Sequence, residues 1–167
     1  MPSGAAARAG LERDLVRTLA EWDGGSAPIT SLYLSVDGRR FPRMQDYELR
    51  LAQELRRARD LAESLDLDKE ARRSVEADCA AIASFVHERF ERGATRGLAV
   101  FSANAAGRWE VVALPRSVRN QIMIGAQADI LQLEALLDTY PTTCTALADF
   151  KTARLFLACL GRIEDVT

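Results

Sequence analysis

Histidine, lysine and cysteine are scarce in this 167-residue sequence, which excludes several kinds of site. One histidine and two lysines are present, and the three cysteines form no CxxC pair, so zinc-type ligand spacing is absent. An odd number of cysteines favours reduced thiols in a cytoplasmic protein, and all three thiols are expected to be buried. The cysteines are Cys79, Cys144 and Cys159.

Long apolar runs are also missing. No stretch approaches the roughly 20 uncharged apolar residues that a membrane span requires. Residues 1–10 are rich in alanine and lack the apolar segment of a secretion signal, so they are predicted to be a flexible tail. A hydrophobic content of 48% with a net charge of −2 excludes intrinsic disorder and predicts one folded core.

Motifs that carry catalysis are absent as well. The sequence contains no phosphate-binding glycine loop and no nucleophile elbow. The tripeptide Gly125-Ala126-Gln127 resembles one used in peptidyl-tRNA hydrolysis, but it stands directly before a predicted helix, where glycine serves as a turn residue. The single histidine, His87, is expected on a helix surface. We therefore predict no catalytic residue, no metal and no cofactor, and expect that the chain alone is not an enzyme.

The first half of the sequence alternates between helical and extended patterns. Apolar residues at helical spacing predict a helix over residues 11–22, and strict alternation over residues 30–37 predicts a strand with one buried face. Two long helices follow, the first with Asp46 as its N-cap, the second with Asp68 as N-cap and Gly93 as C-cap. Because their link is short, the two helices should form an antiparallel hairpin.

In the second half, the period changes from 3.6 to 2. Residues 97–102 and 109–114 predict a β-hairpin, residues 118–124 a further strand and residues 128–138 a helix. Two apolar strands, 143–148 and 153–160, and a short segment over 162–167 end the chain. The predicted fold class is α/β (α+β), with a mixed β-sheet covered by the helical hairpin and an extra C-terminal β-hairpin.

Arginine supplies nearly all of the positive charge, and it clusters. The clusters on the two long helices are interleaved with glutamate and aspartate, so pairing on a solvated helix face explains them. The loop Arg39-Arg40-Phe41-Pro42-Arg43 differs, because it holds three guanidinium groups and no acid before Asp46. Guanidinium groups suit phosphate recognition. This loop is therefore the candidate contact with RNA or the ribosome.

Four segments, taken in order, resemble one known family. They are residues 30–35 (TSLYLS), residues 96–102 (RGLAVFS), residues 113–115 (ALP) with 118–120 (VRN), and residues 148–156 (ADFKTARLF). Together they resemble the bacterial members of the archaeo-eukaryotic class-1 release factor superfamily, which includes Pelota and the ribosome hibernation factor Balon. The resemblance implies an amino-terminal domain over residues 11–140 and the opening β-hairpin of a truncated, RNase H-like central domain over residues 141–167.

The sequence departs from that family at two places. Stop-codon readers carry an Asn-Ile-Lys-Ser motif between the two long helices, whereas residues 64–69 read SLDLDK, an acidic tip that mRNA would repel. The family's catalytic Gly-Gly-Gln lies further into the central domain, beyond residue 167. The resemblance thus implies a translation-associated, ribosome-binding protein, with ribosomal RNA or tRNA as partner, that neither reads stop codons nor releases peptide by itself. Two alternatives stay open: a fragment of a peptidyl-tRNA hydrolase-type release factor, or a protein-interaction module without an RNA role.

The C-terminal hairpin, residues 143–161, carries apolar surface that an isolated two-stranded hairpin cannot keep from water. It could fold back on the sheet of its own chain, or its open edge could pair with a second copy. We expect a homodimer through this hairpin, with Leu155, Phe156 and Leu157 as candidate interface residues.

Overall fold

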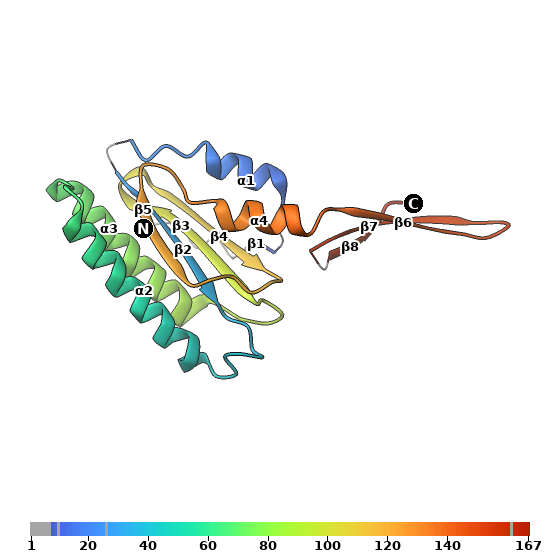
Figure 1. Cartoon of the computed structure of the whole chain (residues 1–167), viewed down its shortest axis with the longest axis horizontal. Coiled ribbons are helices and arrows are strands. Elements are labelled where there is room, and N and C mark those ends of the chain that lie inside the picture. Colours follow the sequence, from blue (N-terminus) through green and yellow to red (C-terminus); the bar gives the residue numbers. More distant parts are fainter. Residues whose placement is uncertain (1–7, 10, 26, 161) are drawn as a thin grey trace.

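The computed structural model of the chain describes residues 8–9, 11–25, 27–160 and 162–167. Its elements divide between a five-stranded sheet with four α-helices and a smaller C-terminal sheet (Figure 1). In chain order they are β1 (Arg8–Ala9), α1 (Arg13–Ala20), β2 (Ile29–Ser35), α2 (Met44–Ser64), α3 (Lys69–Ser84), a π-helical turn (Phe85–Arg89), β3 (Gly97–Ala103), a 3₁₀ turn (Asn104–Ala106), β4 (Arg108–Leu114), β5 (Gln121–Gly125), α4 (Leu131–Thr139), β6 (Thr143–Ala148), β7 (Ala153–Cys159) and β8 (Arg162–Asp165).

The larger sheet has the strand order β1-β4-β3-β2-β5. Its only parallel pair among the described residues is β1 with β4, and all other pairs are antiparallel. The predicted β3–β4 hairpin is confirmed, and Gly107 closes it with a φ of +64°, a left-handed conformation that suits glycine. The predicted α/β (α+β) class and mixed sheet are therefore confirmed.

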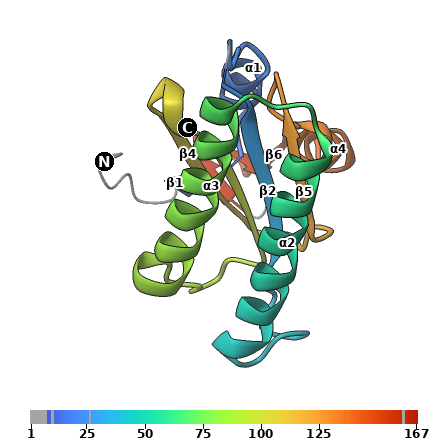
Figure 2. The same ribbon diagram turned by 90° about the vertical axis from the view of Figure 1, so that its left-hand side faces the viewer.

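Helices cover both faces of this sheet. The antiparallel pair α2 and α3 lies on one face, while α1 and α4 lie on the other, as Figures 1 and 2 show. The side chains of β2 alternate between the two layers: Leu32 and Leu34 pack under α2 and α3, and Tyr33 packs under α1 and α4. The sheet is thus the middle layer of a three-layer sandwich with two apolar cores.

The prediction that the first strand has one buried face is wrong. All seven residues of β2 are buried, the polar ones included. Ser31 accepts a hydrogen bond from the backbone N–H of Asp129 at 3.0 Å, and Ser35 shares a 2.7 Å hydrogen bond with Ser117. Because these hydroxyls have hydrogen-bond partners inside the protein, the polar residues of β2 can be buried along with its apolar residues.

The helical hairpin follows the predicted apolar seam, with corrections at its ends. Asp68 caps α3 by accepting a hydrogen bond from the N–H of Ala71 at 2.8 Å, as predicted. Asp46 is not the N-cap of α2; Arg43 is, and Asp46 sits three residues later, where its carboxylate accepts the N–H of Arg43 at 3.0 Å. Gly93 does have a φ of +47°, but the helical segment ends earlier, at Arg89, with Phe90 as its C-cap.

The two chain ends are more structured than predicted. Two residues of the predicted flexible tail, Arg8 and Ala9, form β1; residues 1–7 and 10 lie outside the described residues. The C-terminal hairpin is not two-stranded, because β8 adds a third antiparallel strand to β7. This smaller sheet projects from the sandwich (Figure 1), and Leu160 at its base is buried with α1 and α4.

The cysteines occupy three different environments. Cys79 is fully buried under the helical hairpin, and burial raises the pKa of its thiol to about 11. Cys159 is half-buried, and Cys144 is exposed on β6, so the prediction of three buried thiols is wrong for Cys144.

Among the described residues, no helix is long and apolar enough to cross a membrane.

Candidate functional site

The arginine loop, residues 37–43, begins where β2 leaves the sheet. The backbone carbonyl of Asp37 accepts hydrogen bonds from the N–H groups of Arg40 at 2.9 Å and of Phe41 at 2.8 Å. The Asp37 carboxylate also accepts the N–H of Arg39 at 3.1 Å. These contacts fold the loop into a defined turn, because one residue at its start satisfies three of its backbone donors.

A second residue, Arg92, holds the other half of the loop. Its guanidinium donates hydrogen bonds to the carbonyl oxygens of Phe41 at 2.7 Å and of Pro42 at 3.2 Å. Phe41 in turn packs against the apolar core beneath α2 and α3. The loop backbone is therefore tied to the sandwich from both sides, although the loop lies at its end (Figure 2).

The three predicted arginines of this loop, Arg39, Arg40 and Arg43, are all exposed. Within the described part of the chain none of them forms an ion pair. The carboxylate of Asp46 is already used by the backbone of Arg43. The arrangement thus presents three uncompensated guanidinium groups from an anchored backbone, a geometry that suits an anionic partner.

The tip between α2 and α3 carries acidic residues, in contrast to the positively charged arginine loop. Asp66 is exposed there, and Asp68 is committed to capping α3. The tip and the arginine loop lie at opposite ends of α2, one helix length of 21 residues apart. The helical hairpin consequently separates an acidic end from an end that carries the arginine loop.

Asp78 is a buried carboxylate that sequence reasoning missed. It accepts hydrogen bonds from the hydroxyls of Thr30 at 2.8 Å and Ser102 at 2.6 Å, and from the N–H of Asn104 at 2.9 Å. Burial raises the pKa of this carboxyl above its ordinary value. Its position four residues before Ile82 places an acid on the apolar stripe of α3, which is the signal that could have revealed it. The contacts join α3 to β2 and β3, and Asp78 is fully buried, which is the arrangement of a structural residue.

His87 lies on the surface of the π-helical turn, as expected for this lone histidine. Its Nδ1 is 2.8 Å from the Oε1 of Glu48 on α2. The hydrogen bond and the charge of Glu48 raise the pKa of His87 above its ordinary value. The pair joins α2 to the turn that follows α3, and the hydrogen-bond partner of His87 among the described residues is a carboxylate and not a nucleophile.

The tripeptide Gly125-Ala126-Gln127 is part of the fold. The carbonyl of Ala126 accepts a hydrogen bond from the N–H of Gly24 at 3.0 Å, and Gln127 pairs with Asp23 in a β-bridge. The segment thus anchors the loop that follows α1.

No group of three or more potential metal ligands occurs among the described residues.

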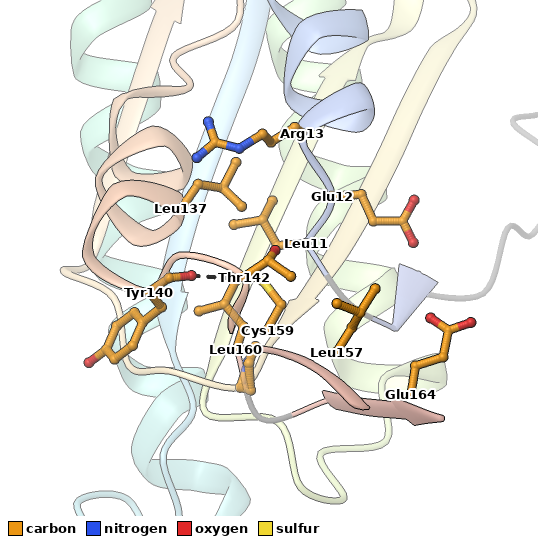
Figure 3. Close-up of a pocket in the computed structure, with 11 residues that line it drawn as sticks. Leu11, Glu12, Arg13, Leu137, Tyr140, Thr142, Leu157, Cys159, Leu160 and Glu164 are labelled. Carbon is orange, nitrogen blue, oxygen red and sulfur yellow. Dashed lines mark hydrogen bonds between the residues drawn. The ribbon is translucent and has the colours of Figure 1, made fainter. Parts of the chain in front are cut away.

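The candidate interface residues of the C-terminal sheet do not share one face. Leu155 and Leu157 lie on one side of β7, and Phe156 lies on the other, where the guanidinium of Arg154 stacks 5.1 Å from its ring centre. Leu157 lines a cavity of about 360 Å³ at the base of the sheet, together with Leu11 and Leu137 (Figure 3). The sheet therefore folds partly back on its own domain, while Leu155, 41% exposed, stays open to solvent.

Comparisons with known proteins show a fold and no family. No protein-family model and no curated protein matches the chain. Among solved structures, the crystal structure of the archaeal translation termination factor aRF1 is similar with a TM-score of 0.55 at 18% identity, over 95% of this chain and 44% of that one. A second structure, described as an archaeal protein, has a TM-score of 0.53 at 19% identity, over 92% of this chain and 42% of its own.

At such identities the likeness is one of fold. The chain spans less than half the length of either structure, but nearly all of its own length is included. The fold is therefore release-factor-like, as the sequence segments predicted.

Proposed function

We propose that this chain is a translation-associated, ribosome-binding module of the release factor superfamily, working in the cytoplasm, that contacts ribosomal RNA or tRNA. Hibernation or stalling of ribosomes is the setting that the sequence resemblance favours. Two independent lines support the proposal: four sequence segments resemble that superfamily, and the fold is similar to a translation termination factor over 95% of the chain.

The observation that carries the proposal is the anchored arginine loop. Arg92 and Asp37 fix its backbone, so that Arg39, Arg40 and Arg43 are held outward without acidic partners in the described part of the chain. Pre-organised cations lose less conformational freedom on binding than cations on a loose loop. Phosphate contacts of this kind give an affinity that falls steeply with salt.

The proposal includes no codon reading and no peptide release by this polypeptide. The exposed Asp66 and the neighbouring Asp68 would be repelled by mRNA phosphates at the tip where a codon reader must approach. Among the described hydroxyls that hydrogen-bond a carboxylate, Thr30 and Ser102 bind the fully buried Asp78, and Ser84 binds Glu88 one turn further along the helical segment. A release assay with the purified chain, programmed ribosomes and each stop codon should therefore give the background rate of hydrolysis. Stop-codon-dependent release would contradict this part of the proposal.

Ribosome binding is tested with the triple variant Arg39→Ala, Arg40→Ala, Arg43→Ala. Alanine leaves the backbone contacts of the loop in place, so the fold should persist while three phosphate contacts are lost. A matched control is Arg56→Ala, Arg59→Ala, Arg73→Ala, which removes the same charge from exposed positions on α2 and α3. Co-sedimentation with ribosomes over a range of salt concentrations compares the three proteins. Absence of binding by the unmodified chain would favour the protein-interaction module instead.

A further inference from the structure

A second group of arginines lies at the same edge of the sheet as the arginine loop. The strand register aligns the end of β2, the start of β3, the end of β4 and the start of β5 in one row: Ser35 is opposite Gly97, and Gly97 is opposite Leu114. On the other side of β2, Tyr33 is opposite Gln121. The loops that follow or precede these residues must therefore emerge together.

Hydrogen bonds join these loops to one another. The N–H of Val36 donates to the carbonyl of Arg96 at 3.0 Å, and the N–H of Arg96 donates to the carbonyl of Leu114 at 2.9 Å. The side chain of Asn120 accepts the N–H of Ser35 at 2.7 Å. Loop 115–120 is also packed tightly on β3, because a Cβ added at Gly97 would stand 2.5 Å from the carbonyl oxygen of Arg116. The three loops form one rigid edge.

Charge on this edge is strongly one-sided. The segments 36–43, 90–96 and 115–120 contain seven arginines and two acids, Asp37 and Glu91, in a chain whose acids outnumber its bases by 24 to 22. Within the described residues, none of the seven arginines forms an ion pair. The seven are Arg39, Arg40, Arg43, Arg92, Arg96, Arg116 and Arg119.

The arginines outside the loop are oriented by neutral partners. Arg116 stacks on the ring of Tyr140 at 4.4 Å, and Arg119 donates to the side-chain oxygen of Gln121 at 2.9 Å. Such contacts position a guanidinium without neutralising it. Arg96 precedes β3, so it lies between the arginine loop at the end of β2 and the end of β4, and its backbone is hydrogen-bonded to Val36 and Leu114.

We propose that Arg96, Arg116 and Arg119 continue the arginine loop into a single phosphate-binding rim that runs across the edge of the sheet and holds the backbone of RNA. The rim spans β5, β2, β3 and β4, about 14 Å at ~4.8 Å for each of three strand spacings. That width accommodates several successive phosphates. The inference extends the proposed function, on which it rests for the identity of the RNA, and assigns the binding surface to the sheet edge and not to one loop.

The test measures binding of the full chain to a fluorescent 20-base-pair RNA duplex and to a 20-nucleotide oligouridylate as a function of salt. The variant Arg96→Ala, Arg116→Ala, Arg119→Ala should lower the slope of log Kobs against log[salt] by about 2–3 on the duplex, since each lost phosphate contact removes ~0.9. The double variant Arg96→Ala, Arg119→Ala keeps the Arg116–Tyr140 stacking and should lower it by about 2. The helix-face triple Arg56→Ala, Arg59→Ala, Arg73→Ala should keep the original slope.

The outcomes separate the rim from the proposed function. If the folded rim variants bind RNA with the same slope of log Kobs against log[salt] as the unmodified chain, the proposal of a phosphate-binding rim is contradicted. This holds even if the loop variant loses ribosome binding. If the unmodified chain binds neither RNA probe, the rim is overturned as well. If RNA binding depends on the rim but the chain does not co-sediment with ribosomes, the rim stands and the ribosomal role fails.

Discussion

The two sheets of this molecule are both built mainly from antiparallel strands, yet they differ in what covers them. Each of the seven residues of β2 is buried, whereas all six of β6 are exposed. The large sheet gains apolar burial on both faces, whereas the described apolar contacts of the small sheet with the sandwich lie at its base, around Leu157 and Leu160. The difference indicates that most of the stabilising apolar burial is in the sandwich.

The largest effect should come from matched leucine truncations in the two sheets. Leu34 on β2 is fully buried, and Leu147 on β6 is 60% exposed. Leu34→Ala should lower the free energy of unfolding by about 2–5 kcal/mol, because it leaves a cavity in a packed core. Leu147→Ala should change it by less than about 0.5 kcal/mol. Urea unfolding measures both values, and equal losses would contradict the contrast between the sheets.

A smaller effect is expected at the buried carboxylate that joins the helical layer to the sheet. Asp78→Ala leaves the hydroxyls of Thr30 and Ser102 and the N–H of Asn104 without their acceptor, at a cost of about 1–3 kcal/mol. Asp78→Asn keeps an acceptor oxygen and should cost less. A loss from Asp78→Asn as large as that from Asp78→Ala would show that charge, and not hydrogen bonding, matters at this position.

The same residue gives a pH dependence with a defined sign. The pKa of Asp78 is raised in the folded protein above its ordinary value of 3.8, so the folded state holds the proton more tightly than the unfolded state does. Stability must then fall as the pH rises from about 4 through the raised pKa. Asp78→Asn does not titrate, so the stability of the unmodified chain relative to this variant should decline over that window in urea unfolding at successive pH values. A relative stability that rises with pH would contradict the assignment.

The sequence predicts the elements that depend on local periodicity. The seam of α2 and α3, the Asp68 cap and the β3–β4 hairpin are all confirmed. The errors arise where partners are distant in sequence. Thr30 reads as an outward polar residue, but it is buried because Asp78, 48 positions later, accepts its hydroxyl. β1 pairs two residues with β4 across about a hundred positions, and no local pattern records such a pairing.

The residues of the candidate site also divide into those that the sequence could predict and those that it could not. The three arginines of the loop could be chosen from the sequence because no acid stands among them. Arg92 could not be assigned to the loop, since it lies 51 residues from the carbonyl of Phe41 that it holds. The neighbourhood of Arg96, Arg116 and Arg119 likewise depends on strand register, which the sequence alone did not supply.

The smallest effect on stability should come from the exposed edge of the small sheet, where we expect the homodimer to form. β6 carries no charged side chain, whereas β8 carries Glu164 and Asp165, so β6 is the edge suited to pair with a second copy. Light scattering should give a mass that rises from monomer to dimer over micromolar concentrations. Thr145→Lys should return the mass to that of a monomer and leave the unfolding free energy nearly unchanged. A monomer mass at all concentrations of the unmodified chain would refute the dimer.

Salt-dependent co-sedimentation with ribosomes tests the central claim most directly. The unmodified chain should bind ribosomes with an affinity that falls steeply with salt. Arg39→Ala, Arg40→Ala, Arg43→Ala should weaken binding and lower the slope of log Kobs against log[salt] by about 2–3, whereas Arg56→Ala, Arg59→Ala, Arg73→Ala should leave it unchanged. Equal affinity and equal slope for all three proteins would contradict the assignment of ribosome binding to the arginine loop.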